Sequence, residues 1–204
     1  MKIAVLFGGA SQERDVSIAS AAQIIPALRG LGHDVIAIDT ATGRLTGDAE
    51  KKMLINGVGA EPPSTSSLAS MRESALTLTC NASDIRDVDV VLLALHGGAG
   101  EDGRVQAVLD LAGMAYTGSN HIASATAMDK DLSKRLFRAA GVPTADWLMA
   151  PVLAHDVAET LGWPVVVKPN KQGSTVGLSI VREAAALAAA MQLAQRYDDE
   201  VMVE

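Results

Sequence analysis

The chain is poor in cysteine, in aromatic residues and in long apolar runs, and each shortage excludes a class of protein. Cys80 is the only cysteine among 204 residues, so neither an internal disulfide nor a cysteine-based zinc site can form. Aromatic residues make up 3% of the chain, which leaves Val, Ile, Leu, Met and Ala to build its core. No apolar stretch approaches the roughly 20 residues that span a bilayer, and the apolar run at 3–7 is too short for the core of a signal peptide. We therefore expect a soluble, cytoplasmic protein without a membrane partner.

Positive charge is also in deficit. The formal net charge is -7 at pH 7, and the isoelectric point lies near 5.1. This balance argues against a nucleic acid or an anionic membrane as partner. It does not exclude an anionic ligand, because a small basic pocket can form in an acidic protein. With 49% hydrophobic residues, the chain is long enough for one large or two small domains.

The first forty residues predict a β-α-β unit, and therefore a parallel sheet. A buried strand at 3–7 ends at a double glycine, and the helix that follows has its apolar residues on one face. We expect Asp15 or Ser17 to cap this helix. A second strand runs over 33–38 and closes at Asp39.

Residues 40–84 are rich in Gly, Thr, Ser and Pro and keep no helical period. We interpret them as an irregular surface excursion with one short strand at Ala75–Cys80. The remainder is expected to form strands and helices in the following order: strand 88–95, helix 104–112, strand 115–117, one or two helices over 122–140, an extended stretch at 144–150, helix 157–161, antiparallel strands 165–168 and 178–181, helix 183–196 and strand 201–204. This order predicts an α/β domain over 1–120 and an α+β unit over 121–204.

The stretch from His96 to Ala107 is the first candidate site. An apolar strand leads into His96, four glycines follow, and Glu101 and Asp102 stand at the start of a helix. Glycines let the backbone approach a ligand, and a helix N-terminus offers unpaired amides. The alternative is a tight turn in which both acids merely complement the helix dipole.

A second candidate follows the first strand, at Gly8 to Ser17. Glu13 would project from the carboxyl end of that strand, where open α/β sheets bind ligands. A nicotinamide-binding domain is an alternative, because Asp39 ends the second strand as a ribose-binding acid would. The adjacent Gly8 and Gly9, with no third glycine at the required offset, do not match the dinucleotide fingerprint.

Two lysine-bearing segments complete the candidates. Lys130 has an acid on either side, a spacing that usually indicates solvated ion pairs on a helix. Lys168 ends an apolar strand, and the loop after it contains Gly173, Ser174 and Thr175. Glycines beside hydroxyls and free amides make a phosphate cradle, and a nearby lysine supplies a positive charge for phosphate oxygens.

Five motifs in order resemble the D-alanine–D-alanine ligases of the ATP-grasp superfamily. They are G-G-x-S-x-E-R at Gly8–Arg14, H-G-x-x-G-E-D-G at His96–Gly103, Y-T-G-S at Tyr116–Ser119, M-D-K at Met128–Lys130 and V-K-P with G-S-x-x-G at Val167–Gly177. The resemblance covers the chain apart from about 40–84. It implies a parallel-sheet amino-terminal, pre-ATP-grasp domain over 1–120, followed by the α+β first subdomain of an ATP-grasp fold over 121–204.

The resemblance also implies the reaction. The family couples two D-alanines with ATP and Mg2+: ATP phosphorylates the carboxylate of the first, and the amine of the second attacks the acyl phosphate. The dipeptide serves peptidoglycan synthesis and thus the cell wall. Carried over by motif, Glu13 holds the ammonium of the first D-alanine, Ser174 belongs to the same hydrogen-bond network, and His96 lies near the reacting carboxylate.

The implied ATP site draws on both lysines, the glycine loop and the last acid. Its residues are Lys130, Lys168, Gly173, Ser174, Thr175 and Glu204. No metal ligand is carried over, because the family's magnesium ligands lie beyond the equivalent of Glu204. We therefore expect this chain to be inactive by itself. The family is commonly dimeric through its amino-terminal domain, so a homodimer is an expectation.

Two further functions remain open from the sequence. A ligase that accepts D-lactate or D-serine as second substrate would carry the same motifs, because the pocket that selects the second substrate lies largely outside them. A non-catalytic protein that binds D-alanine or ATP for regulation is the other alternative. The presence of Glu13, His96, Lys130, Lys168 and Ser174 favours the enzyme.

Overall fold

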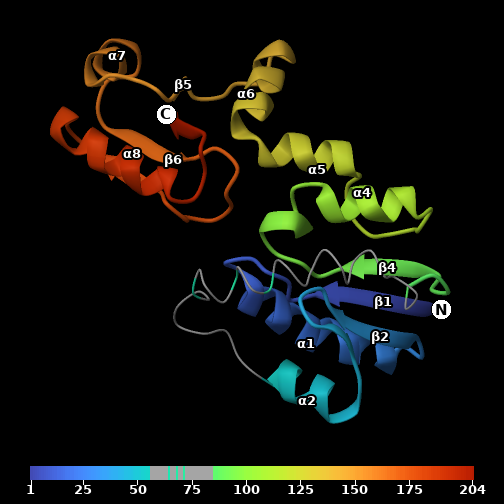
Figure 1. Cartoon of the computed structure of the whole chain (residues 1–204). Coiled ribbons are helices and arrows are strands. Elements are labelled where there is room, and N and C mark those ends of the chain that lie inside the picture. Colours follow the sequence, from blue (N-terminus) through green and yellow to red (C-terminus); the bar gives the residue numbers. More distant parts are fainter. Residues whose placement is uncertain (56–63, 65–67, 69–70, 72–84) are drawn as a thin grey trace. The chain divides into compact units, whose positions relative to one another are not determined.

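The computed structural model describes residues 1–55, 64, 68, 71 and 85–204. The chain divides into two compact units, Met1–Ala125 and Thr126–Glu204, which Figure 1 shows in the blue-to-green and yellow-to-red parts of the ribbon. Each unit has its own four-stranded sheet. None of the described helices is long and apolar enough to cross a membrane.

The sheet of the first unit is mixed. Its strands are β1 (Lys2–Phe7), β2 (Asp34–Asp39), β3 (Gly43–Leu45) and β4 (Val90–Leu93). They lie in the order β3-β2-β1-β4. Both β2 and β4 pair with β1 in parallel, whereas β3 pairs with β2 antiparallel. The predicted β-α-β unit is thus confirmed, and the carboxyl ends of β1, β2 and β4 meet at one edge.

Helices cover both faces of this sheet. They are α1 (Arg14–Gly30), α2 (Gly47–Ile55) and α4 (Arg104–Leu111), with a 3-10 turn η1 at Gly98–Gly100. A further helix, α5 (His121–Met128), has no buried residue, and the boundary between the two units falls within it. Successive side chains of β1 point to opposite faces, so Val5 and Phe7 pack with Ile25 of α1. Leu6 packs with Leu109 of α4. All β1 residues after Lys2 are buried, which explains the unbroken apolar run.

The structure differs from the sequence expectation at 43–55, where β3 and α2 replace an irregular excursion. The helix α2 is attached to α1 by an ion pair: both guanidinium nitrogens of Arg29 bind the Glu50 carboxylate, at 2.5 and 3.0 Å. A helix held by a polar contact leaves little apolar periodicity in its sequence. The strand expected at Ala75–Cys80 lies outside the described residues.

The second unit has an antiparallel sheet. Its strands are β5 (Leu148–Met149), β6 (Val165–Pro169), β7 (Ser179–Val181) and β8 (Val201–Val203). Their order is β5-β8-β6-β7, with antiparallel pairing throughout. Its helices are α6 (Lys130–Ala139), α7 (Ala154–Thr160) and α8 (Leu187–Gln195), and a 3-10 turn η2 (Ala184–Ala186) precedes α8. Sequence reasoning predicted the antiparallel pair β6–β7 and all three helices.

The core of the second unit is built from small and β-branched residues. Val167 and Val203 of the two central strands are fully buried and pack with Ala194 of α8 and Val157 of α7. Alanines on the inner face of α8 leave room for the valines of the sheet. The central position of β6 fixes Lys168 and the loop that follows it.

Candidate functional site

Glu13 lies in the turn that leaves β1, immediately before α1. A Cβ placed on Gly97, which follows β4, would lie 2.7 Å from Oε2 of Glu13. The turns after β1 and β4 are joined by Ser11, whose hydroxyl donates to the carbonyl of His96 at 2.6 Å. The structure therefore brings Glu13 and the glycine turn together at the carboxyl edge of the sheet, and the positive φ of 66° at position 97 favours glycine there.

The ring of His96 is oriented by α1. Its Nε2 lies 3.1 Å from the hydroxyl of Ser20, and that hydroxyl donates to the carbonyl of Val16 at 3.0 Å. Because a serine hydroxyl has one hydrogen, Oγ of Ser20 accepts from Nε2–H. This leaves Nδ1 to face the carboxylate of Glu101, 3.9 Å away. Sequence reasoning missed Ser20, which stands in a helix without a motif around it.

Asp39 is not a ribose-binding acid, and the nicotinamide interpretation is wrong. It is fully buried, and its two oxygens accept from Arg14 at 2.9 and 2.6 Å. The amides of Gly9 and Ala41 also donate to Oδ1. Burial alone would raise the pKa of Asp39, but these hydrogen bonds outweigh it and hold the pKa below its usual value. Asp39 and Arg14 thus fix the glycine turn that precedes Glu13.

The predicted capping of α1 by Asp15 or Ser17 is wrong. The helix begins at Arg14, and no side chain caps it. The hydroxyl of Ser17 instead accepts from the amide of Gly8 at 2.8 Å and donates to the carbonyl of Ala94 at 2.6 Å. Ser17 is fully buried, because it joins the ends of β1 and the neighbouring β4 segment beneath the turn.

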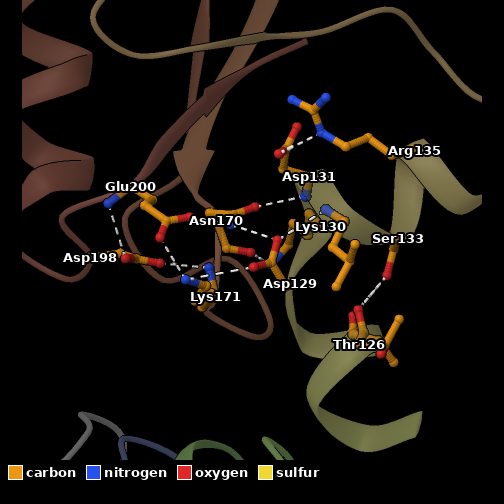
Figure 2. A network of polar contacts seen from close by, with 12 residues as sticks. Thr126, Asp129, Lys130, Asp131, Ser133, Arg135, Asn170, Lys171, Asp198 and Glu200 are labelled. Carbon is orange, nitrogen blue, oxygen red and sulfur yellow. Dashed lines mark hydrogen bonds and ion pairs between the residues drawn. The ribbon is translucent and has the colours of Figure 1, made fainter. Parts of the chain in front are cut away.

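Lys130 stands at the start of α6, and its ammonium group binds the loop after β6. Nζ donates to the carbonyls of Asn170 and Gln172, at 2.9 and 2.6 Å. Figure 2 shows the start of α6 beside the loop after β6 and the segment before β8 that carries Glu200. Burial lowers the pKa of Lys130, and the charge of Lys168 adds to this effect. The solvated ion pair expected from the spacing exists between Asp131 and Arg135, but not at Lys130.

Lys168 and Lys134 hold the carboxylate of Glu204 from two sides. Nζ of Lys168 contacts Oε1, and Nζ of Lys134 lies 2.6 Å from Oε2. Burial opposes ionisation of Glu204, but the hydrogen bonds from both lysines outweigh it, so its pKa lies below the usual value. Lys134 is also buried and lies 5.2 Å from the ring centre of Trp147. Lys134 follows Lys130 by one helical turn, a spacing that could have identified it.

The loop between β6 and β7 has an uncommon backbone conformation. Ser174 is the one non-glycine residue with positive φ, at 54°, in the described part of the chain. Ser174 and Thr175 are exposed, and no hydrogen bond from the amides at 173–175 is found within the described residues. A Cβ at Gly177 would lie 2.8 Å from the Tyr197 ring. The loop therefore turns tightly and leaves its tip available to a ligand.

The predicted residues thus fall into two groups, each inside one unit. Glu13 and His96 meet in the first unit, through Ser11 and Gly97. The second unit contains the ATP-site candidates Lys130, Lys168, Gly173, Ser174, Thr175 and Glu204, which lie on α6, on β6, in the loop after β6 and directly after β8. Asn170, which is fully buried, was missed because its partners are distant in sequence.

Comparison with known proteins finds one family along almost the entire chain. A sequence model described as the D-ala D-ala ligase N-terminus matches residues 2–119, and one described as the D-ala D-ala ligase C-terminus matches residues 136–204. The D-alanine–D-alanine ligases of Verminephrobacter eiseniae and Geobacter sulfurreducens are 41% and 38% identical over all of this chain, which covers 51% and 54% of those proteins.

Solved structures show the same relationship. The VanG D-Ala:D-Ser ligase from Enterococcus faecalis is 28% identical with a TM-score of 0.75, covering all of this chain and 62% of that structure. The D-alanine–D-alanine ligase from Bacillus anthracis is 31% identical with a TM-score of 0.71, covering 100% and 56%. The chain spans about half the length of the curated relatives it matches. The sequence matches and the two sheets together establish that the chain belongs to the D-alanine–D-alanine ligase family.

Proposed function

We propose that this protein is an ATP-dependent ligase that joins two D-alanines through an acyl phosphate, for peptidoglycan precursor synthesis in the cytoplasm. The observation that carries the proposal is that Lys168 lies near enough for its charge to lower the pKa of Lys130, and that Lys130 binds a glycine loop whose tip is exposed. Family membership supplies the reaction, since the curated relatives are D-alanine–D-alanine ligases.

The second unit supplies the charges that an ATP phosphate chain requires. Lys130 and Lys168 neutralise phosphate oxygens, and the amides of Ser174 and Thr175 donate to the phosphoryl group that is transferred. Phosphoryl transfer depends on positioning and charge neutralisation more than on covalent help from the protein. Glu204, which is fixed by Lys134 and Lys168, would contact the adenine.

The first unit supplies the site for the first D-alanine. The carboxylate of Glu13 attracts its ammonium group, and His96 stands near its carboxylate. A carboxylate oxygen attacks the γ-phosphorus, and the bond from this phosphorus to the bridging oxygen of ADP breaks. The amine of the second D-alanine then attacks the carbonyl carbon. Phosphate leaves from the tetrahedral intermediate, and the amine loses a proton.

No step of the proposed reaction is assigned to magnesium. Within the described residues, no group of three or more His, Cys, Asp or Glu side chains is placed to hold a metal ion. The contributions assigned above belong to the lysines, the amides of Ser174 and Thr175, Glu204, Glu13 and His96.

A second candidate function differs in the second substrate. One of the similar structures is a D-Ala:D-Ser ligase, with a TM-score of 0.75. We include D-serine for that reason. Supplying D-serine in place of the second D-alanine, with mass spectrometry of the dipeptide, distinguishes the two activities.

Binding of Mg-ATP to the 204-residue chain, measured by calorimetry, is the first test. We expect binding in the wild type and a loss of at least tenfold in affinity for Lys168→Met, because a phosphate-binding charge is removed. Lys52→Met, which removes a lysine at an exposed position in α2, is the matched control and should bind normally. Absence of binding, or equal affinities of the two variants, would overturn the proposed nucleotide site.

D-alanine-dependent phosphate release from Mg-ATP tests the reaction. We expect no release from the 204-residue chain by itself. If release is observed, that expectation is wrong, and a fall of at least tenfold in Glu13→Gln, with ATP affinity unchanged, supports the assignment of Glu13 to D-alanine. Glu159→Gln, at an exposed position in α7, is the control. Intact mass is measured on the same sample, so that release is assigned to a chain of known length.

A further inference from the structure

Both the nitrogen and the oxygen of the Asn170 side-chain amide form hydrogen bonds within the second unit. Its Nδ2 donates to Oδ1 of Asp129 at 2.9 Å and to Oε2 of Glu200 at 2.8 Å. Its Oδ1 accepts from the amide of Asp131 at 2.9 Å. Lys171 contacts the same two carboxylates, at 3.5 Å for Asp129 and 2.6 Å for Glu200. Figure 2 shows Asn170 between the start of α6 and the segment before β8.

The start of α6 is completed by this residue. The first amides of a helix have no partner within the helix. Here the amide of Lys130 donates to the Asn170 carbonyl at 3.4 Å, and the amide of Asp131 donates to its side chain. The third amide, that of Leu132, donates to the capping side chain of Asp129 at 3.0 Å. Asn170 therefore caps α6 from the turn that follows β6, and these three amides are not available to a phosphate group.

Asn170 also binds the ammonium group of Lys130. Its backbone carbonyl and that of Gln172 accept both observed hydrogen bonds from Nζ. The backbone amide of Asn170 donates to the carbonyl of Glu200 at 2.9 Å, which fixes the residue to the segment before β8. Asn170 thus connects the helix that carries Lys130, the loop that carries Ser174 and the central strands.

We propose that Asn170 is a positioning residue for nucleotide binding: it holds the start of α6 and the glycine loop in one arrangement, so that Lys130 and the loop amides act on the same phosphate chain. The proposal rests on the proposed function. An amide is required at this position, because two donors face carboxylates and one acceptor faces an amide. Aspartate, with the same shape, would offer no donor to Asp129 or Glu200.

The test is a double-mutant cycle on Mg-ATP affinity, with adenosine as the probe that lacks phosphates. Asn170→Ala should weaken Mg-ATP binding about tenfold, the size expected from losing a helix cap, and change adenosine affinity less than twofold. In a Lys130→Met background, Asn170→Ala should weaken Mg-ATP binding clearly less than it does in the wild type, because part of its effect is transmitted through Lys130. A merely structural role would weaken both ligands equally in either background.

Asn120→Ala is the matched control, since Asn120 also caps a helix, accepting from the amide of Ala123 at 2.9 Å. It should leave Mg-ATP affinity unchanged. If Asn170→Ala does not fold, Asn170→Asp is compared with Asn170→Asp combined with Glu200→Gln, which restores one donor toward position 170. Partial recovery of Mg-ATP affinity in the pair supports the proposal, and no recovery contradicts it.

The two proposals fail in different ways. If the wild type does not bind Mg-ATP, or Lys130→Met binds it normally, the proposed nucleotide site fails and the role of Asn170 fails with it. If Lys130→Met weakens binding and Asn170→Ala does not, or if the two losses add in full, the nucleotide site stands and the positioning role is overturned.

Discussion

Asp39 is the buried charge on which the turn before Glu13 depends. A charge inside a protein is tolerated when it is paired and hydrogen-bonded. Asp39 satisfies both conditions, because it binds Arg14 through two nitrogens and accepts from Gly9, Ala41 and Thr42. Removing one partner leaves the other charge without compensation. The residue thus affects a candidate substrate contact that it does not touch.

Asp39→Ala should lower the free energy of unfolding by about 3–5 kcal/mol, the usual cost of breaking a buried pair. The native pKa of Asp39 lies below its ordinary value. Its stabilising contribution is therefore present above the unfolded pKa, near pH 4, and is lost as pH falls through the native pKa. Urea unfolding between pH 3 and pH 7 measures both the loss of stability in the variant and the dependence of stability on pH. Asp199→Ala, at an exposed position, should match wild type, and a variant of Asp39 with wild-type stability would contradict the account.

The tautomer of His96 follows from one hydroxyl group. We expect nitrogen chemical shifts in NMR to show hydrogen on Nε2 in the neutral ring, because Ser20 gives its own hydrogen to Val16. Ser20→Ala should give a mixture of both tautomers and cost roughly 1 kcal/mol of stability, typical of one hydrogen bond. Hydrogen on Nδ1 in the wild type would contradict this orientation of the hydroxyl.

Helices and strands differed in how well their sequences predicted them. The strands β1 and β6 are continuous apolar runs, and the glycine at 141 and the proline at 143 mark the end of α6, so local signals were sufficient. The helix α2 was missed, since the Arg29–Glu50 ion pair that attaches it leaves no apolar period and only Met53 and Leu54 pack against the core. The motif residues of the candidate site could be proposed because glycines and lysines follow strand ends, and their roles stay predictions. Asn170 and Ser20 were not, because only the folded chain brings them to their partners.

The attachment of α2 can be tested without unfolding the sheet. Glu50→Ala should accelerate amide exchange throughout α2 and leave β1 and β2 protected, because the helix loses its ion pair while the strands keep their ladder. Arg29 is partly exposed, so we expect a cost of about 1 kcal/mol, near the value for surface pairs. Lys51→Ala, at an exposed position in the same helix, should leave exchange unchanged. Equal protection of α2 in both variants would contradict the role of Glu50.

Each unit has a hydrophobic core of its own. The clusters around β1 contain residues of the first unit, and the cluster around β6 contains residues of the second. From a change in strand patterns, the sequence predicted a boundary between residues 120 and 121, and that boundary stays a prediction. No signal in the sequence indicated the central position of β8 between β5 and β6, because that order depends on pairing between distant segments.

Separate cores predict separate responses to core mutations. Leu109 and Val167 are fully buried, one in each unit. Leu109→Ala should cost about 2–5 kcal/mol, as truncation of a buried leucine does, and should accelerate amide exchange in β1 and β4 while β6 and β8 keep their protection. Val167→Ala should accelerate exchange in β6 and β8 and spare β1. Mass spectrometry on the full chain measures amide exchange in both units within one experiment. If either variant accelerates exchange equally in both sheets, the units unfold as one, and the division into two cores does not govern the stability of the protein.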